Sequence, residues 1–432
     1  MADIFTEGFR DTPYWWDTSP LCALPAPDLP ARTDAVVIGA GYTGLHAALR
    51  IARAGRNVVV LDAGALGEGC STRNGGQIST SIKPGANLLA LKYGADTARR
   101  ILMDGHASRA YVEDFVTSEG IDCHFRTCGR FHAAHSPKAF QALADAVRNQ
   151  PEGFEVPVTL VPRAEQHSEI GSDFYHGGAV FHSHAELDPG RYHAGLVGLC
   201  RKAGVTFHPH TRATGLSPDD TGVTVSTSRG SVWAGDAILA TNGYTDGLSP
   251  WHQRRVIPIG SYIIATEELP AAVIDTLIPN RRIVSDSRKV VYYYRASPDR
   301  RRILFGGRVS AGETDTRSSG RKLYADMLRI FPQLEGVRVS HSWMGFVGYT
   351  FESMPHTGTQ GRVHHAMGYC GSGVGMASYL GMKTGLRVVG DAQAATGLGD
   401  VAFPTRPLYR GRPWFLPATV AFYRLKDRMG LT

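Results

Sequence analysis

The chain has 432 residues, 43% of them hydrophobic and 20% charged, which is typical of a folded protein large enough for two domains. No apolar run reaches the roughly 18 residues that a membrane-spanning helix needs, and residues 1–30 lack the basic start and apolar centre of a signal peptide, so the cytoplasm is the expected location. The net charge of +7 would suit nucleic acid, but the basic residues form no stripe and the run 300–302 is expected at a hairpin tip, so we expect no nucleic-acid partner.

Residues 1–30 are expected to form an arm that packs on the body of the protein. The segment is rich in proline, which prevents a long helix, and it carries the aromatic run Tyr14, Trp15 and Trp16. We expect these aromatic side chains to be buried as packing groups rather than to act as reactive ones.

The strongest pattern in the sequence begins with a β-branched run at residues 35–38, typical of a strand buried on both faces. Gly39, Gly41 and Gly44 follow at once as G-x-G-x-x-G. The first glycine permits a tight turn, the second lets backbone approach a pyrophosphate, and the third lets helix and strand pack closely. This order predicts a dinucleotide whose phosphates lie at a helix N terminus.

A second strand, expected at residues 58–61, ends on Asp62, where an acid accepts a ribose hydroxyl. An acidic residue argues against the 2′-phosphate of NADP, whereas NAD and FAD both stay open. The loop at residues 67–77 then combines glycines with hydroxyl, amide and guanidinium donors that could wrap a pyrophosphate and reach a ring system. An ordinary surface loop is the alternative.

Together these segments resemble a known family. The run GAGYTGLHAALRIARAGRNVVVLDA followed by GEGCSTRNGGQ is similar to the FAD-binding start of the D-amino-acid oxidase, glycine oxidase and sarcosine oxidase superfamily. Within it, the YT pair and the RNGGQ block are similar to the gamma-glutamylputrescine oxidase branch. The family uses the second loop for the flavin, so the resemblance implies FAD. The FAD-binding residues that it implies in this part of the chain are Gly39, Ala40, Gly41, Tyr42, Thr43, Gly44, Asp62, Ala63, Ser71, Thr72, Arg73, Asn74, Gly75, Gly76 and Gln77.

Periodicity predicts the next elements. Residues 88–118 have helical spacing that is broken at Gly105, residues 123–134 alternate like a strand, and residues 136–149 form a helix begun by a proline. Residues 174–187 are strand-like.

His182 and His184 alternate within that last segment, so both could lie on one side of a strand. A metal site needs a third and a fourth ligand. The sequence offers no such set, and we predict no metal.

The chain is then expected to return to the first domain. A helix from residue 189, a strand at 205–207 and a meander at 223–233 complete a doubly wound arrangement, and a buried strand begins at residue 236. The resemblance implies that Ala213 contacts the adenine and that Thr241 lies beside the cofactor.

Residues 257–266, 288–295 and 302–308 are rich in β-branched and aromatic residues and predict antiparallel strands of a second sheet. Alternate residues of a strand face opposite ways, so either Tyr292 and Tyr294 or Tyr293 alone could face a substrate.

The last part of the chain again resembles the superfamily, through a W-x-G block and a glycine-rich turn that opens a helix directed at the flavin ring. The residues implied at the cofactor here are Gly345, Gly371, Ser372, Gly373, Val374 and Gly375. The helix N terminus would stabilise negative charge on the reduced flavin.

Two positions depart from the family pattern. Val347 stands where glycine oxidases have an arginine that clamps the substrate carboxylate, and near the cysteine that links the flavin in sarcosine oxidases. Ser372 stands where the branch often has histidine. A simple α-amino acid is therefore a less natural substrate than an amine whose anionic group lies farther away.

After Phe403 the sequence combines a Pro/Arg loop with a basic amphipathic helix. Attachment to a membrane surface is one interpretation. A cap that packs on the body is the one we favour.

The expected fold is α/β: a Rossmann-like FAD-binding domain and a second, mainly antiparallel-sheet substrate domain, as in the glutathione-reductase and D-amino-acid oxidase type. The expected parts are an arm (1–30), a discontinuous FAD-binding domain (31–118, 186–245 and 340–395), a substrate domain (119–185 and 246–339) and a C-terminal extension (396–432).

The resemblance implies FAD-dependent oxidation of the C–N bond of a primary or secondary amine, as in gamma-glutamylputrescine oxidases, to an imine that water hydrolyses to an aldehyde plus an amine or ammonia. O₂ is the expected electron acceptor and is reduced to H₂O₂, so we favour an oxidase over a dehydrogenase. The alternatives are an oxidase or dehydrogenase of an N-alkyl or anion-bearing amino compound, and a non-catalytic flavin-binding subunit. The sequence leaves the oligomeric state open. The candidate substrate-side residues are Tyr262, Tyr293, Arg308, Tyr349 and Glu352.

Overall fold

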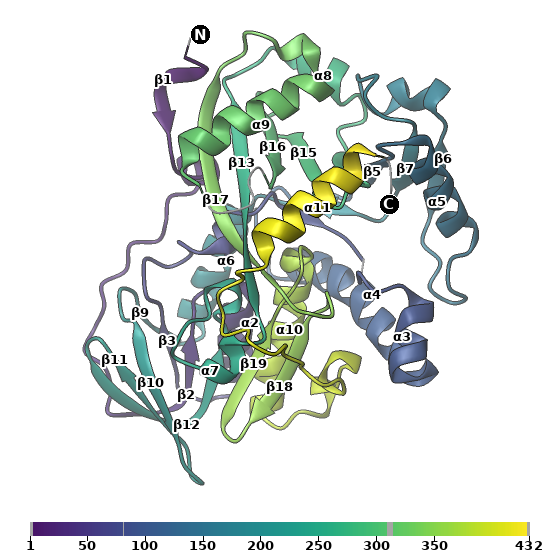
Figure 1. Cartoon of the computed structure of the whole chain (residues 1–432). Helices are drawn as coiled ribbons and strands as arrows, with labels where there is room; N and C mark the ends of the chain where they lie inside the picture. Colours follow the sequence, from purple (N-terminus) through teal and green to yellow (C-terminus); the bar gives the residue numbers. More distant parts are fainter. Residues whose placement is uncertain (1–2, 81, 309–313, 430–432) are drawn as a thin grey trace.

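The computed structural model describes residues 3–80, 82–308 and 314–429, and its strands form two large β-sheets (Figure 1). Successive segments of the chain contribute strands first to one sheet and then to the other, so each sheet is assembled from segments far apart in sequence. None of the helices within the described ranges has the length and apolarity that spanning a bilayer requires.

The first sheet is centred on β2 (Arg32–Ile38), which lies between β3 (Val58–Leu61) and β12 (Gly230–Leu239), with all three parallel. Val36 and Val37 are fully buried, because helices or other strands cover both faces. β12 pairs with β11 through its first half and with β19 through its second. The other strands of this sheet are β9 (Thr206–His208), β10 (Ala213–Pro218), β11 (Val223–Thr227), β18 (His356–Gln360) and β19 (Val363–Met367).

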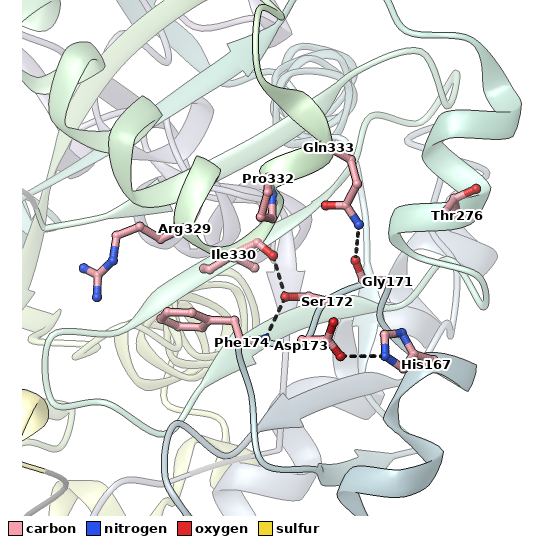
Figure 2. Close-up of a pocket in the computed structure, with 10 residues that line it drawn as sticks. All are labelled: His167, Gly171, Ser172, Asp173, Phe174, Thr276, Arg329, Ile330, Pro332 and Gln333. Atoms are coloured by element: carbon pink, nitrogen blue, oxygen red, sulfur yellow. Dashed lines mark hydrogen bonds and ion pairs between the residues drawn. The ribbon is translucent and has the colours of Figure 1, made fainter.

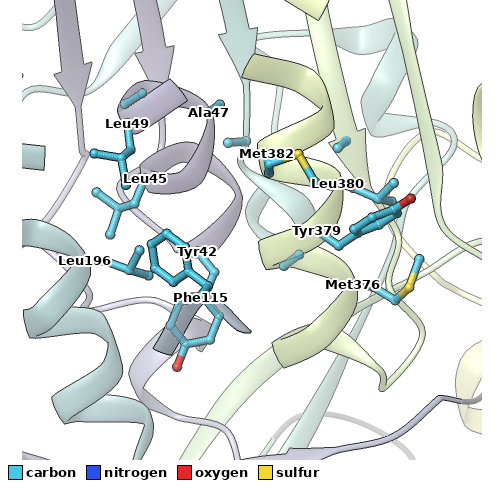
Figure 3. Packing of buried hydrophobic residues seen from close by; sticks show 14 of the residues in the cluster. Tyr42, Leu45, Ala47, Leu49, Phe115, Leu196, Met376, Tyr379, Leu380 and Met382 are labelled. Atoms are coloured by element: carbon cyan, nitrogen blue, oxygen red, sulfur yellow. The ribbon is translucent and has the colours of Figure 1, made fainter. Parts of the chain in front are cut away.

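Three helices pack together on this sheet. α2 (Tyr42–Arg53) lies between α6 (Pro189–Lys202) and α10 (Gly373–Val388), as Figure 3 shows. Leu45 and Leu49 of α2 belong to the same buried cluster as the side chains of the two neighbours. Gly381 lets α10 approach α2 closely, since any side chain at this position would overlap the backbone of α2.

The second sheet has nine strands in the order β1-β17-β13-β16-β15-β14-β5-β7-β6. Most neighbours are antiparallel, but β1 pairs parallel with β17 and β14 pairs parallel with β5. α9 (Thr316–Ile330) covers one face and contributes Leu323 and Met327 to the core of this sheet. The strands are β1 (Phe5–Arg10), β5 (Arg130–Ala133), β6 (Val158–Val161), β7 (Gly178–Phe181), β13 (Ile257–Thr266), β14 (Ile283–Asp286), β15 (Tyr292–Ala296), β16 (Ile303–Gly307) and β17 (Val339–Tyr349).

The remaining elements are short strands and helices between or beside the sheets. They are β4 (Gln77–Ile78), β8 (Ala185–Glu186), α1 (Trp15–Thr18), α3 (Ala86–Tyr93), α4 (Ala95–Ser118), α5 (Pro137–Arg148), α7 (Pro250–Gln253), α8 (Ala271–Leu277) and α11 (Leu416–Arg428).

The predicted helical break was placed at the wrong glycine. The chain interrupts the helix at Gly94, whose φ of 83° ends α3, and α4 continues through Gly105. Gly105 is small for a packing reason, since a Cβ there would lie 2.7 Å from the carbonyl oxygen of Thr80.

Two predicted strands are shorter than expected. Of residues 123–134 only β5 is extended, and the segment at 174–187 is divided into β7 and β8 by a turn that contains His182 and His184. His182 bonds to the hydroxyl of Thr159, and the ring of His184 stacks on Phe181. Within the described ranges, no three His, Cys, Asp or Glu side chains are grouped so that they could hold a metal ion.

The N-terminal arm packs on the body, and its first residues form a strand that was not predicted, β1 at the edge of the second sheet. Of the aromatic residues that follow, Tyr14 and Trp15 are buried as expected, whereas Trp16 is only partly buried. Trp15 is 0% exposed, and its indole N–H donates to the carbonyl oxygen of Asn74 at 2.9 Å. The arm therefore braces the loop at residues 67–77.

Replacing Trp15 with alanine is expected to lower the free energy of unfolding by about 3–5 kcal/mol, because a large buried ring leaves a cavity and the Asn74 carbonyl loses its donor. Urea unfolding measures the change. Trp414→Ala is the matched control, since that ring is 68% exposed and its loss should change the stability by less than about 0.5 kcal/mol. Equal losses in the two variants would contradict the bracing role.

Candidate functional site

One cavity of about 1860 Å³ lies where the carboxyl ends of β2 and β12 face the second sheet. A pocket for a single small ligand has about 300–1000 Å³, so this one has room for a dinucleotide and a substrate together. The turn from β2 into α2 forms part of its wall. Gly39 has a φ of 106°, and a Cβ on it would lie 3.0 Å from the carbonyl oxygen of Ala240.

Asp62 holds this turn in place. Its carboxylate accepts the N–H of Ala40 at 2.8 Å and the N–H of Gly64 at 3.0 Å. Burial raises the pKa of Asp62, and the two backbone donors oppose that rise. The carboxylate thus lies at the cavity wall, where the sequence expectation places a ribose.

The loop at residues 67–77 is fixed from both sides. Ser71 Oγ accepts the N–H of Tyr42, the first residue of α2, at 3.0 Å. Arg73 donates to the carbonyl of Glu68 at 2.6 Å and to that of Met344 on β17 at 3.2 Å. The loop therefore joins the glycine turn to the second sheet.

Most of the residues expected at the cofactor line this single cavity. They are Gly39, Ala40, Gly41, Tyr42, Thr43, Asp62, Ala63, Ser71, Arg73, Asn74, Gly75, Gln77, Ala213, Thr241, Gly345, Gly371, Ser372, Gly373 and Val374.

Four expected residues lie behind the wall instead. A side chain built on Gly44 would overlap the carbonyl of Gly39 in the same turn, one on Gly76 would overlap the carbonyl of Leu187, and one on Gly375 would lie 3.3 Å from the Ser108 hydroxyl. Thr72 is buried, and its hydroxyl donates to the carbonyl of Gly67 at 2.6 Å. These residues shape the site through packing.

Three of the five substrate-side candidates line the same cavity: Tyr293, Tyr349 and Glu352. The Tyr293 hydroxyl is 2.8 Å from the hydroxyl of Ser261, and burial raises its pKa, so the phenol stays neutral at pH 7. The Tyr349 hydroxyl accepts from Lys83 Nζ at 2.6 Å. Glu352 forms an ion pair with Lys92 of α3.

The other two candidates were misplaced. Tyr262 is 0% exposed in the core of the second sheet, where its hydroxyl accepts the N–H of Thr314 at 3.0 Å. Its neighbour Ser261 faces the cavity in its place, since successive residues of a strand alternate. Arg308 lies outside the cavity wall and donates to the carbonyl of Gly260 at 2.7 Å.

The tyrosine run follows the predicted alternation. Tyr293 faces the cavity, whereas Tyr292 and Tyr294 belong to the core of the second sheet.

Sequence reasoning missed the polar residues of β5 and β14. Arg130, His132 and Ser285 line the cavity, and His132 Nδ1 is 3.0 Å from Ser285 Oγ. Burial lowers the pKa of His132 to about 4, so the ring is neutral at pH 7. The alternation over residues 123–134 was the available signal, but it could not say which face of the strand meets the cavity.

α11, in yellow in Figure 1, crosses in front of the second sheet in that view. Its Tyr423 is a lining residue, and Asp427 accepts the backbone N–H groups of Lys289 and Val290 at 2.9 and 3.0 Å. The predicted cap is thus joined to the body by hydrogen bonds.

A second hollow of about 630 Å³ lies beside the C-terminal end of α9 (Figure 2). Its polar contacts are between its own wall residues, such as the pair of His167 with Asp173. None of the predicted site residues lines it.

Comparisons with known proteins place the chain among flavoenzymes. The family described as DAO, FAD dependent oxidoreductase, matches residues 34–385. The chain is 31% identical over 403 residues to gamma-glutamylputrescine oxidoreductase of Escherichia coli K12, covering 92% of this chain and 93% of that protein.

Solved structures give the same result for the fold. Glycine oxidase from Geobacillus kaustophilus is similar with a TM-score of 0.70 at 18% identity, over 88% of this chain and 99% of that one. L-proline dehydrogenase from P. horikoshii has a TM-score of 0.69 at 18% identity, over 90% of this chain and 99% of that one. These likenesses confirm the predicted fold class.

Proposed function

The chain belongs to the DAO family of FAD-dependent oxidoreductases and binds FAD, and from this premise we propose that it oxidises the C–N bond of an amine of the gamma-glutamylputrescine type. This is the family that the sequence motifs resemble. An amine or amino compound is the substrate class of such an enzyme. The observation that supports oxidation of an amine of this type is one cavity lined both by the glycine turn at Gly39 and by the phenols of Tyr293 and Tyr349.

The residues of the cavity fit FAD. The α2 N terminus offers backbone N–H groups to the pyrophosphate, and Gly41 has no side chain that would come within 2.8 Å of the Ser71 hydroxyl. At the other end, Gly371 and Gly373 open α10, and a Cβ built on Gly373 would meet no atom within 4 Å. We propose that this helix N terminus faces the flavin ring, where its dipole favours negative charge.

Bound FAD supplies the acceptor for the two electrons that leave the amine. The amine gives up a hydride from carbon and a proton from nitrogen, and the resulting imine is hydrolysed to an aldehyde and ammonia or a smaller amine. We propose that O₂ takes the two electrons and two protons as H₂O₂.

The chain's own residues orient and desolvate the amine. The wall around Tyr293 and Phe346 presents aromatic rings, which lower the pKa of a bound ammonium so that the neutral amine can react. The Tyr293 and Ser261 hydroxyls form a pair that can accept one N–H of the substrate. No side chain needs to act as a strong base, because the neutral amine already carries its lone pair.

The experiment is anaerobic mixing of the purified holoenzyme with mono-acylated diamines, N-methyl amino acids and aminophosphonates while the flavin absorbance is recorded. We expect acylated diamines to bleach the flavin, and peroxide to appear when air is admitted. Bleaching only by N-methyl amino acids or aminophosphonates would replace the substrate class proposed here. Bleaching followed by no oxygen uptake would replace the oxidase by a dehydrogenase.

A further inference from the structure

The Arg130 side chain in the cavity wall has no carboxylate partner among the described residues. Arg130, on β5, lines the cavity, and its guanidinium has no hydrogen bond or ion pair with any residue in the described part of the chain. Burial lowers its pKa to about 10, which leaves it protonated at pH 7. Arg130 is half-buried and its Nε is buried without a hydrogen-bond partner, so leaving the cation unpaired has a cost that a ligand with an anionic group would remove.

Three arginines of the neighbouring strands and loops, unlike Arg130, each have a carboxylate partner. Arg282 is paired with Glu169 at 2.5 Å, Arg295 with Glu186 at 3.0 Å, and Arg288 with Asp286 at 3.4 Å. Asp286 also lines the cavity, but besides this ion pair it accepts the backbone N–H of Tyr292 at 3.1 Å. Glu169, Glu186 and Asp286 therefore each pair with an arginine other than Arg130.

Arg130 ends a polar row that crosses the sheet. In register, Tyr293 of β15 lies opposite Ser285 of β14, and Ser285 lies beside His132 of β5, two residues from Arg130. All four side chains face the cavity. Neighbouring strands are about 4.8 Å apart, so the β5 end of the row lies roughly 10 Å across the sheet from Tyr293.

We propose that Arg130 binds a carboxylate at the far end of the amine substrate, so that the enzyme selects amines with a distant carboxylate. This rests on the proposed amine oxidation and specifies its substrate class. A guanidinium can bind a carboxylate through two parallel hydrogen bonds, and the polar pair of His132 and Ser285 adjoins that position. Val347, on β17 five strands away from β5, offers no charge for a carboxylate next to the amine.

The test compares two substrates that differ only in the distant group. The holoenzyme is assayed with N-acetylputrescine, which has no carboxylate, and with N-succinylputrescine, which has one. In the wild type we expect KM for the succinyl compound to be at least about tenfold lower. In Arg130→Gln we expect that KM to rise about thirtyfold or more, with kcat little changed and the acetyl compound unaffected.

Arg99→Gln is the matched control, because Arg99 is an exposed residue of α4 that does not line the cavity. It should leave both KM values unchanged. Arg130→Lys keeps the charge without the planar fork, and we expect an intermediate KM for the succinyl compound. If Arg130→Gln does not fold, the KM of Arg130→Lys for the succinyl compound still tests whether the guanidinium binds the carboxylate.

Binding without turnover gives an independent measurement. N-butylsuccinamic acid carries the same carboxylate but no amine, and calorimetry should show its Kd weakened by Arg130→Gln to the same extent as KM. Equal KM values for the two substrates in the wild type, or an equal change of both in the variant, would overturn the carboxylate site. If neither diamine bleaches the flavin, the amine proposal fails, while the calorimetric comparison still decides whether Arg130 binds a carboxylate.

Discussion

Alanine at Gly44 is expected to yield a protein that no longer retains FAD. A Cβ at this position would overlap the carbonyl oxygen of Gly39 and lie 2.9 Å from a methyl carbon of Val37. Both contacts are with the β2–α2 unit itself, so α2 would have to move away from the strand, and its N terminus would leave the pyrophosphate position. The ratio of flavin to protein absorbance after purification measures the loss.

Gly198→Ala is the control for the Gly44 variant. Gly198 also lies inside a helix, α6, but a Cβ there meets no atom within 4 Å. Alanine favours a helix over glycine by about 1 kcal/mol, so this variant should be as stable as the wild type or more so, and yellow. A Gly44→Ala protein with a full complement of flavin would show that the third glycine is not a packing requirement.

Acid is expected to destabilise the protein strongly below pH 6.5. Burial lowers the pKa of His46 and His356 to about 3 and that of His252 to about 4, so all three are neutral in the folded protein. Their stability contribution is complete above the unfolded pKa of about 6.5 and falls as the pH drops toward the folded values, because the unfolded chain takes up the protons first. Each histidine costs about 1.4 kcal/mol per pH unit.

A substitution at His356 measures the contribution of one buried histidine to this acid sensitivity. The His356 ring is 1% exposed and stacks on Phe403 with centroids 4.2 Å apart, and neither nitrogen has a hydrogen-bond partner among the described residues. Its Nε2 lies 3.6 Å from a Glu352 carboxylate oxygen, but burial and Lys92, which pairs with Glu352, lower the pKa of the ring. Phenylalanine can keep the stack without titrating. We therefore expect His356→Phe to be more stable than the wild type by a margin that grows by about 1.4 kcal/mol per pH unit below pH 6.5.

Urea unfolding at pH 7.5, 6.5 and 5.5 provides the comparison. The difference between the two proteins is the useful quantity, because buried carboxyl groups with raised pKa values, such as Asp104 and Asp286, act in the opposite sense in both. Parallel stability curves for variant and wild type would show that His356 is not neutral and buried.

The dinucleotide turn was predictable because its chemistry is local. Gly39, Gly41, Gly44 and Asp62 fall within one strand–helix–strand stretch, so their spacing is visible in the sequence, although Gly39 packs against Ala240 and Gly41 against Ser71. The helix begun by Asp188 was predictable for the same reason, since that carboxylate caps α6 through the N–H groups of the next turn.

The rest depended on partners far away in the sequence. The break assigned to Gly105 ignored its contact with Thr80, which only the folded chain creates. Tyr262 was assigned to the site because a strand pattern defines two faces without saying which one meets the cavity. Arg130 was overlooked because the strand beside it begins at Ile283, about 150 residues later.

The strand order also determines when this protein can become complete during its synthesis. Phe5 of β1 pairs with Val339 of β17, so the first strand has to wait until more than three quarters of the chain has left the ribosome. At 5–20 residues per second this interval lasts roughly 20 to 70 seconds. Throughout it, the nascent chain carries β1, with Phe5 and Phe9, without its partner strand. An unpaired strand edge with exposed apolar side chains favours association between chains, so this interval is when the newly made protein is most open to aggregation.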